Sequence, residues 1–212
     1  MTTATAPGTA ATTASRPPAK GRPRGFDREQ ALEAALMEFW RHGYEATSIA
    51  TLTKAMGINP PSLYAAFGDK RKLFSAAVQR YAETHGDYGS RALDQPTAHR
   101  VVETMLRLAA TEYTDAAHPP GCLVIDAATN TSEASQDVAE ELRTYRENTK
   151  QAIADRITAD VQAGTLPPKT DAPALATFYA AVIQGMSTQA RDGASEAQLQ
   201  RVADVALAAW PA

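Results

Sequence analysis

The stretch from Thr47 to Lys72, TSIATLTKAMGINPPSLYAAFGDKRK, restricts the possible fold more than any other part of the chain. Apolar residues recur at intervals of three and four in its first half, which predicts a short amphipathic helix. Gly57 follows at a position where glycine ends a helix at low cost, and Asn59 can cap a second helix. Pro60 and Pro61 then occupy the first turn, where no backbone N–H is needed. Two short helices joined by a tight turn form a helix-turn-helix, whose second helix is expected to enter a DNA major groove.

The segments on either side of this motif predict two further helices. Asp27 and Gln30 have the spacing of a capping box, and an apolar stripe runs from there through Arg41. Gly43 is expected to end this first helix. Asp69 caps a later helix, which leads out of the motif and into the rest of the chain.

The remainder of the chain keeps a helical pattern to its end. Residues 85–96 are expected to form the end of the preceding helix and a linker. Five more helices are then predicted, at about 97–113, 122–128, 138–164, 171–191 and 195–210. The sequence contains no convincing strand pattern, no signal peptide and no apolar run of the ~18–20 residues that a membrane span needs. The predicted fold is all-α, with an N-terminal three-helix helix-turn-helix head and a C-terminal helical body.

Charge is distributed unevenly along the chain. The formal net charge is −3, but residues 1–85 hold 11 Lys and Arg against 7 Asp and Glu, whereas residues 86–212 hold 10 against 17. A basic N-terminal part on an acidic remainder fits a DNA-binding head joined to a body that phosphates repel. The charge distribution alone does not exclude an asymmetry that arises by chance.

Residues 1–22 predict a disordered, basic N-terminal arm. The first 19 residues are rich in Thr, Ala, Pro and Gly and contain almost no bulky apolar side chain. Arg22 and Arg24 follow in a Pro- and Gly-rich context, from which an arm can reach into a minor groove or along phosphates. A solvated basic tail without contacts is the alternative.

Three segments carry a resemblance to a known family. They are GRPRGFD at 21–27, GYEATSIATLTKAMGI at 43–58 and SLYAAFGDKRKLF at 62–74. The last segment is the most specific. Its pattern is a small residue followed by Leu, Tyr, two variable residues and Phe (62–67), with a Lys three residues after the Phe (Lys70). From about Gly21 to Tyr81 the chain resembles the DNA-binding domain of the TetR/AcrR family of transcriptional regulators.

The resemblance implies a regulator in two parts. Residues 23–84 would form the DNA-binding domain and residues 85–212 a ligand-binding and dimerisation domain. It implies a cytoplasmic homodimer that represses transcription from a palindromic double-stranded DNA operator and is released by a small-molecule effector. No membrane association is expected.

DNA contacts are expected from both helices of the motif and from the arm. Hydroxyl and ammonium groups near helix starts suit phosphates, and they are supplied by Tyr44, Thr47 or Ser48, Tyr64 and Lys70. Tyr64 and Lys70 match backbone-contacting positions of the family. Base-edge contacts are expected from Asn59, Pro60, Ser62 and Ala65. Because these side chains are small, readout should depend on thymine methyl contacts and DNA shape.

The body supplies candidates for the ligand pocket and for the dimer interface. Bulky side chains between about 97 and 190 are pocket candidates, with ordinary core packing as the alternative: Met105, Tyr113, Tyr145, Phe178 and Met186. The family resemblance places the dimer interface on the last two helices, about 171–191 and 195–210. Small residues there would allow close helix approach, namely Ala174, Ala180, Ala181, Gly185, Ala203 and Ala208.

The sequence lacks recognisable catalytic or metal-binding motifs. It contains no GxGxxG, P-loop, nucleophile elbow, CxxC or HxxxH, and its four histidines stand singly at positions 42, 85, 99 and 118. Each histidine is interpreted as a surface or core residue. No metal, cofactor or enzymatic activity is therefore expected, and a helical enzyme that does not bind DNA is the remote alternative.

Cys122 is the only cysteine, which excludes an intrachain disulfide and fits a reducing cytoplasm. It begins a predicted helix, where the helix dipole stabilises a thiolate, so a thiol-based sensor of oxidants or electrophiles is one hypothesis. A Gly-Cys-Leu turn at this place is also similar to one in a TetR subgroup, some of whose members respond through cysteine. The alternative is a small core residue, because Leu123, Val124 and Ile125 make the surroundings apolar.

Overall fold

The computed structural model describes residues 1–2 and 26–211, and this part of the chain contains helices and no strand. The head is built from the first four helices: α1 (Arg28–Ala46), α2 (Ile49–Met56), α3 (Pro60–Phe67) and α4 (Lys70–Glu83). The other helices build the body: α5 (Tyr88–Leu93), α6 (Ala98–Glu112), α7 (Leu123–Asp126), α8 (Gln136–Gln162), α9 (Ala172–Arg191) and α10 (Glu196–Leu207). A single 3₁₀ turn, Glu133–Ser135, precedes α8. The all-α prediction is confirmed.

Side-chain caps fix where most of the helices begin. At seven helices, α1, α2, α3, α4, α6, α9 and α10, a side chain accepts a hydrogen bond from a backbone N–H in the first turn. These cap residues are Asp27, Ser48, Asn59, Asp69, Thr97, Asp171 and Ser195. Asp27 accepts from the N–H groups of Glu29 and Gln30. A reciprocal capping box occurs at Ser195 and Gln198.

Gly43 interrupts α1, as the sequence predicts. Its φ of 76° and ψ of 172° are not helical, and one short turn follows it to Ala46. A Cβ at this position would lie 3.1 Å from the carbonyl oxygen of Ala127, so glycine also permits a close approach by the segment after α7.

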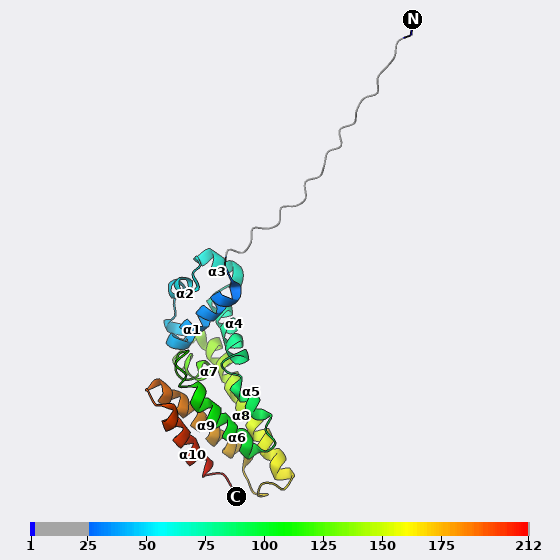
Figure 1. Ribbon diagram of the computed structural model, residues 1–212, viewed down its shortest axis with the longest axis vertical. Coiled ribbons are helices and arrows are strands. Elements are labelled where there is room, and N and C mark those ends of the chain that lie inside the picture. The colour runs from blue at the N-terminus through cyan, green and yellow to red at the C-terminus, as the bar shows by residue number, and fades with distance from the viewer. Residues whose placement is uncertain (3–25, 212) are drawn as a thin grey trace.

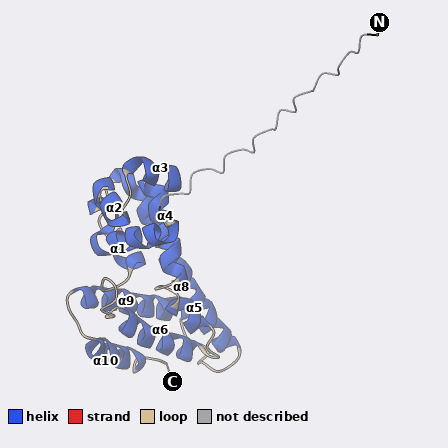
Figure 2. Ribbon diagram, turned by 45° about the horizontal axis from the view of Figure 1, so that its top comes forward, coloured by secondary structure: helices blue, strands red, loops and turns tan. Residues whose placement is uncertain are grey.

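Helices α1 to α4 pack around an aromatic and aliphatic core at one end of the molecule (Figure 1). Phe39 and Phe74 meet edge to face with ring centroids 5.0 Å apart, and Leu52 and Leu63 are fully buried. Trp40, also fully buried, forms the floor of the head against Tyr81. The body below combines α6, α8, α9 and α10, with α8 packed on α9 and α6 packed on α10 (Figure 2).

Head and body are joined by polar contacts as well as by the chain. Arg71 of α4 forms ion pairs with Asp137 and Glu141 of α8, the second at 2.5 Å. Glu45, after the kink of α1, accepts hydrogen bonds from the backbone N–H and the hydroxyl of Ser132 at 2.9 and 2.8 Å. These contacts tie the last turn of α1 and the first turn of α4 to the body.

One part of the sequence interpretation is wrong. Residues 85–96, expected to be a helix end and a linker, contain the helix α5. Its first residue is not held by a side-chain cap, and its six residues give too little periodicity to recognise. Packing of the buried Ala92 against the body contributes to its stability, as is usual for short helices in proteins. Most of the N-terminal arm predicted at residues 1–22 lies outside the described residues.

Candidate functional site

The helix-turn-helix presents one face to the head's core and the other to solvent. Gly57 ends α2 with φ 65°, and the Asn59 side chain accepts a 2.9 Å hydrogen bond from the backbone N–H of Ser62. On α3, Leu63 and Phe67 lie four residues apart on one face and are both buried. The outer face of α3 therefore consists of short side chains around one aromatic, Tyr64, which is 49% exposed.

Most of the predicted DNA-contacting residues lie on this outer surface. Exposed positions are Ser48, Asn59, Pro60, Tyr64 and Ala65, and partly buried ones are Tyr44, Ser62 and Lys70. Thr47 is an exception, because its side chain is fully buried and its hydroxyl donates to the carbonyl oxygen of Gly43 at 2.6 Å. The hydroxyl of Thr47 is thus withdrawn from any phosphate in this structure. Arg22 and Arg24 lie outside the described residues.

Tyr44 and Lys70 form a pair beside the motif. The ammonium nitrogen of Lys70 lies 4.3 Å from the centroid of the Tyr44 ring, a cation–π contact. The ring itself packs on Phe39 and Phe74 of the head's core. Partial burial lowers the pKa of Lys70 and raises that of Tyr44. The pair leaves a cation and a hydroxyl group at the same edge of the head.

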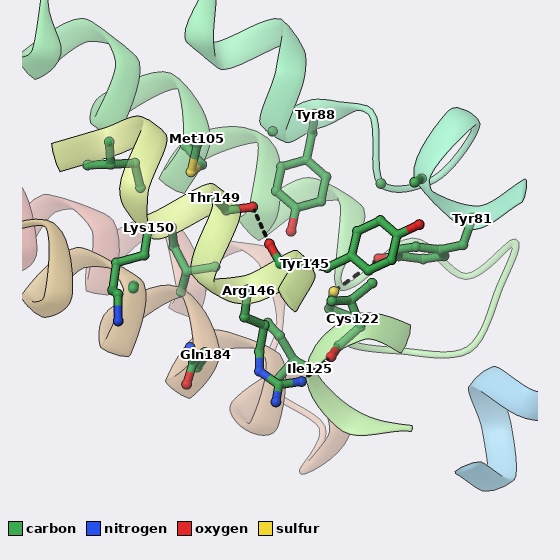
Figure 3. Close-up of a pocket in the computed structure, with 17 residues that line it drawn as sticks. Tyr81, Tyr88, Met105, Cys122, Ile125, Tyr145, Arg146, Thr149, Lys150 and Gln184 are labelled. Carbon is green, nitrogen blue, oxygen red and sulfur yellow. Dashed lines mark hydrogen bonds between the residues drawn. The ribbon is translucent and has the colours of Figure 1, made fainter. Parts of the chain in front are cut away.

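A second feature, a cavity of ≈ 130 Å³, lies where α4, α5, α6, α7, α8 and α9 meet (Figure 3). Its walls are mainly apolar and aromatic: Tyr81, Ala82, Gly86, Tyr88, Gly89, Met105, Cys122, Val124, Ile125, Tyr145, Ile153, Ala180 and Ile183. Four polar residues complete the lining, namely Arg146, Thr149, Lys150 and Gln184. Such a combination of an apolar surface with a few polar groups is typical of small-molecule sites.

The five predicted ligand-binding residues have different positions. Met105 and Tyr145 line the cavity. The other three do not: Tyr113 lies behind Tyr88, whose hydroxyl is 2.6 Å from its own, and Met186 belongs to the buried core. Phe178 is absent from the cavity lining, is 42% exposed, and lies in a surface groove between α9 and α10.

Several lining residues were not predicted from the sequence. Arg146, Lys150 and Gln184 are polar residues on the amphipathic helices α8 and α9, and nothing in the sequence distinguishes them from residues on a solvated face. Tyr81 and Tyr88 reach the cavity from α4 and α5. Tyr81 is 1% exposed, so it belongs to the core as well as to the cavity wall.

Cys122 lies in the wall of the cavity and is 4% exposed. The Tyr81 hydroxyl donates to its sulfur at 3.2 Å (Figure 3). Burial raises the pKa of the thiol, and the Tyr81 hydrogen bond opposes that rise without cancelling it. The backbone N–H of Cys122 donates to the hydroxyl of Ser187 at 2.7 Å and faces a carboxylate oxygen of Asp126 at 3.2 Å. The thiol is therefore held neutral and shielded.

Helix α7 connects the cavity with the head. Val124 and Ile125 of α7 line the cavity, and Arg146 of α8 donates to the Val124 carbonyl oxygen at 2.7 Å. Just past α7, the Ala127 carbonyl oxygen accepts a 2.9 Å hydrogen bond from the backbone N–H of Tyr44. One residue past α7 thus joins the cavity wall to the kink of α1.

These features define a class of protein. A helix-turn-helix with an exposed second helix, mounted on a helical body that contains a cavity, is the architecture of a DNA-binding regulator. None of the helices in residues 1–2 and 26–211 is long and apolar enough to cross a membrane.

Comparisons with known proteins specify the family. Residues 31–77 match the model of "Bacterial regulatory proteins, tetR family", and residues 99–206 match "Tetracyclin repressor-like, C-terminal domain". Two Escherichia coli K12 proteins are similar over most of their length. The chain is 35% identical to the HTH-type transcriptional repressor ComR over 194 residues, which are 91% of this chain and 92% of ComR. It is 36% identical to the repressor BdcR over 188 residues, 88% of this chain and 90% of BdcR.

A solved structure agrees with these matches. It is a cysteine mutant of the TetR family transcriptional regulator CifR complexed with a 26-bp double-strand operator DNA, with a TM-score of 0.86 and 42% identity. The match covers 90% of this chain and all of that one. The chain belongs to the TetR family of bacterial transcriptional regulators. It is a DNA-binding regulator with a helix-turn-helix head.

Proposed function

We propose that this protein is a repressor that binds a two-fold-symmetric operator as a homodimer and is released when a small molecule occupies the cavity beside α7. The relatives ComR and BdcR are named transcriptional repressors, and the related CifR structure contains operator DNA. The proposal includes the division into a DNA-binding part, residues 23–84, and a regulatory body, residues 85–212. It also includes a cytoplasmic location, where the chromosome is accessible, and no catalytic step.

One observation carries the release mechanism, namely the hydrogen bond between the backbone N–H of Tyr44 and the carbonyl oxygen of Ala127. It joins the segment after α7 to the head at the Gly43 kink. A ligand shifts an equilibrium only by binding one state better than another. A molecule that displaces α7 favours a different position of the head and so changes the distance between the two heads of a dimer.

The cavity lining indicates the class of effector. Aromatic and aliphatic walls favour a small, largely apolar molecule. Arg146 and Lys150 add two cationic groups on α8, and burial lowers the pKa of Arg146. A ligand with a carbonyl or carboxylate group facing these two residues would satisfy them. Effectors of this kind are the first to screen.

The DNA-binding step is tested by selecting bound fragments from a genomic library and measuring affinity for the selected site at several salt concentrations. Lys70→Ala should weaken binding to all sequences alike, because each head loses one phosphate contact. The salt slope should fall by about one unit per head, or about two units for the dimer. Lys169→Ala, an exposed position in the body, serves as the control and should leave the slope unchanged. A changed sequence preference with an unchanged slope would show that Lys70 does not contact a phosphate.

The release step is tested by a thermal-shift screen followed by a DNA-binding assay with each stabilising compound. Ala180→Leu should abolish stabilisation by the ligand while retaining operator binding, since the added side chain enters the cavity. If stabilising compounds leave DNA affinity unchanged, the cavity does not control release.

A second candidate mechanism is covalent sensing at Cys122, and it is favoured by the position of the sulfur in the cavity wall. An electrophile bound in the cavity would be next to the thiol, although the raised pKa of Cys122 opposes reaction. Wild type and Cys122→Ser are treated with peroxide or a quinone, and DNA affinity is then measured. Loss of affinity in the wild type alone supports covalent sensing, whereas equal affinities leave the non-covalent mechanism.

A further inference from the structure

Two histidines that are far apart in the sequence meet beneath the head. His85 follows the end of α4, and His118 lies in the loop between α6 and α7. Glu112, the last residue of α6, stands between them. One ligand atom from each of these three residues lies within 4.8 Å of the other two. The Glu112 Oε1 atom is 3.1 Å from His118 Nε2 and 3.5 Å from His85 Nδ1.

The hydrogen bonding of His118 determines which nitrogen faces the cluster. Its Nδ1 is 3.0 Å from the carbonyl oxygen of Pro119, which can only accept, so Nδ1 carries a hydrogen. In the neutral ring, Nε2 then presents a lone pair toward the oxygen of Glu112. The His118 side chain is 1% exposed, and Nε2 is buried without a hydrogen-bond partner. A lone pair buried beside a carboxylate is unfavourable unless a positive charge, either a proton or a metal ion, lies between the two.

The distances match a metal ion better than a shared proton. The Nε2 and Oε1 atoms are 3.1 Å apart, yet their directions do not form a hydrogen bond. Around a tetrahedral zinc ion the ligand atoms are about 3.3–3.4 Å apart, given metal–ligand distances of about 2.0–2.1 Å. Their lone pairs then point at the metal rather than at one another. The separations of 3.1 and 3.5 Å from Glu112 fit two edges of such a tetrahedron.

His85 has the outer support that metal-binding histidines usually have. Its Nε2 lies 3.4 Å from the Glu33 Oε1 atom, which leaves Nδ1 directed at the cluster. A carboxylate behind a ligating imidazole fixes the ring and increases its basicity. Glu33 is itself held by Arg80, whose Nε donates to the other carboxylate oxygen at 3.1 Å.

Trp40 fixes the orientation of both imidazole rings. Its ring stacks on His118 with centroids 4.4 Å apart and planes 19° apart, and its centroid is 5.2 Å from that of His85. Because Trp40 is fully buried, one side of the cluster is closed to water. Three ligand residues from different elements are thus arranged before any ion arrives.

We propose that His85, Glu112 and His118 bind a divalent first-row transition metal ion, with zinc as the reference ion. Two imidazoles and one carboxylate form a donor set suited to zinc, which leaves a fourth position for water or an exogenous ligand. Calcium and magnesium prefer all-oxygen sites and should not compete. The ion would join the end of α4 to α6 and to the loop before α7, at the base of the head.

The test is equilibrium dialysis of the full-length protein, stripped with EDTA, against zinc chloride, with bound metal measured by mass spectrometry. We expect one zinc per chain at micromolar concentration. His118→Gln and Glu112→Gln should each weaken zinc binding at least 100-fold, and Glu33→Gln by about 10- to 100-fold. His42→Gln and His99→Gln, at the two histidines outside the cluster, should bind as the wild type does.

A second measurement does not depend on stoichiometry. In a Trp210→Phe background, Trp40 is the remaining tryptophan. Cobalt(II) should quench its fluorescence saturably and produce d–d absorption bands of a four-coordinate ion, and excess magnesium should do neither. Circular dichroism checks that each variant is folded. The close size of Gln and Glu keeps Glu112→Gln decisive if His118→Gln unfolds.

The proposal is overturned if the folded wild type binds no zinc at micromolar concentration. It is equally overturned if Glu112→Gln binds zinc as tightly as His42→Gln does.

Discussion

Individual residues around Cys122 determine how reactive the thiol can be. The sulfur is buried and accepts a hydrogen bond from Tyr81, and burial raises the pKa of the thiol above its ordinary 9.0. Since the thiolate is the reactive species, we expect iodoacetamide to alkylate Cys122 at least ~10-fold more slowly than a free thiol at pH 7.5. The rate should increase as the pH rises through and beyond 9.

Mass spectrometry after timed labelling measures this rate, and protein in urea supplies the exposed reference. Tyr81→Phe removes the hydroxyl that partly stabilises the thiolate, so labelling should become slower still at each pH. Rapid labelling of the folded protein at pH 7 would mean that the cavity wall opens readily.

Gly121 illustrates how one residue shapes this turn. Its φ is +81°, and a Cβ there would lie 2.7 Å from a carboxylate oxygen of Asp126 and 2.8 Å from the hydroxyl of Ser187. Gly121→Ala should lower the free energy of unfolding by about 1–3 kcal/mol from backbone strain, with a further loss from the clash. Urea denaturation measures the change.

Gly164→Ala is the matched control, because Gly164 has a φ of +76° and no atom within 4 Å of a built Cβ. It carries the strain without the clash. Equal destabilisation in the two variants would show that the side chains around Gly121 can shift to accommodate a Cβ atom at little cost.

At the scale of elements, we expect the junction between α1 and the loop before α8 to respond to pH. Hydrogen bonds from the Ser132 backbone N–H and from nearby hydroxyl groups lower the pKa of Glu45 from 4.5 to about 2. A carboxyl group whose pKa is lower in the folded state stabilises the fold at pH values above its pKa in the unfolded state. This contribution is lost as the pH falls toward the pKa in the folded state. Glu45→Gln should therefore melt below wild type at pH 6.

The difference in melting temperature should narrow between pH 4.5 and about 2, as the Glu45 carboxylate takes up a proton. Thermal unfolding followed by circular dichroism across this range measures it. Glu133→Gln, at a neighbouring exposed position, controls for the loss of one negative charge. A constant difference across the range would indicate that Glu45 does not titrate with the fold.

Elements could be predicted from the sequence where their signals are local. Ser48, Asn59 and Gly57 act within one helical turn of themselves, so the ends of α2 and α3 follow from residue type. Helix α5 is too short for such a signal, and its place depends on packing against the body. Thr47 and Ser48 are equally plausible caps by type, and burial of Thr47 decides between them.

The sites were less predictable because they depend on long-range contacts. His85 and His118 stand singly in the sequence, and their approach to Glu112 requires the packing of α4 on the body. Phe178 belongs to an apolar pattern that marks it for burial, but a pattern does not specify the partner. In this structure Phe178 faces solvent rather than the cavity.

On the scale of the whole molecule, the exposed apolar surface of α9 and α10 requires an explanation. Phe178, Val202 and Val205 are 42%, 39% and 75% exposed and line one groove. Of the small residues predicted to allow close helix approach, Ala174, Ala181, Gly185 and Ala208 are exposed, whereas Ala203 is buried and Ala180 lines the cavity. A contiguous apolar surface of this kind usually marks an interface.

We expect the groove to be covered by the same groove of a second chain. In a two-fold-symmetric dimer the same patch of each chain contacts its copy, so one apolar groove can cover the other. The same symmetry places two helix-turn-helix heads on one palindromic site. Val205→Glu would bury an unpaired charge at this interface, at a cost of roughly 3 kcal/mol or more, so the dimer Kd should rise at least ~100-fold.

Light scattering at micromolar concentration should give twice the chain mass of 22.6 kDa for the wild type and the chain mass itself for Val205→Glu. The exposed Thr144→Glu on α8 adds the same charge outside the groove and should remain dimeric. Operator affinity should fall with Val205→Glu although the variant leaves the head untouched, because a single head reads only half of the site. A wild type that scatters as a monomer would show that the chain does not form this dimer. A Val205→Glu variant that stays dimeric would show that the dimer interface lies on another surface.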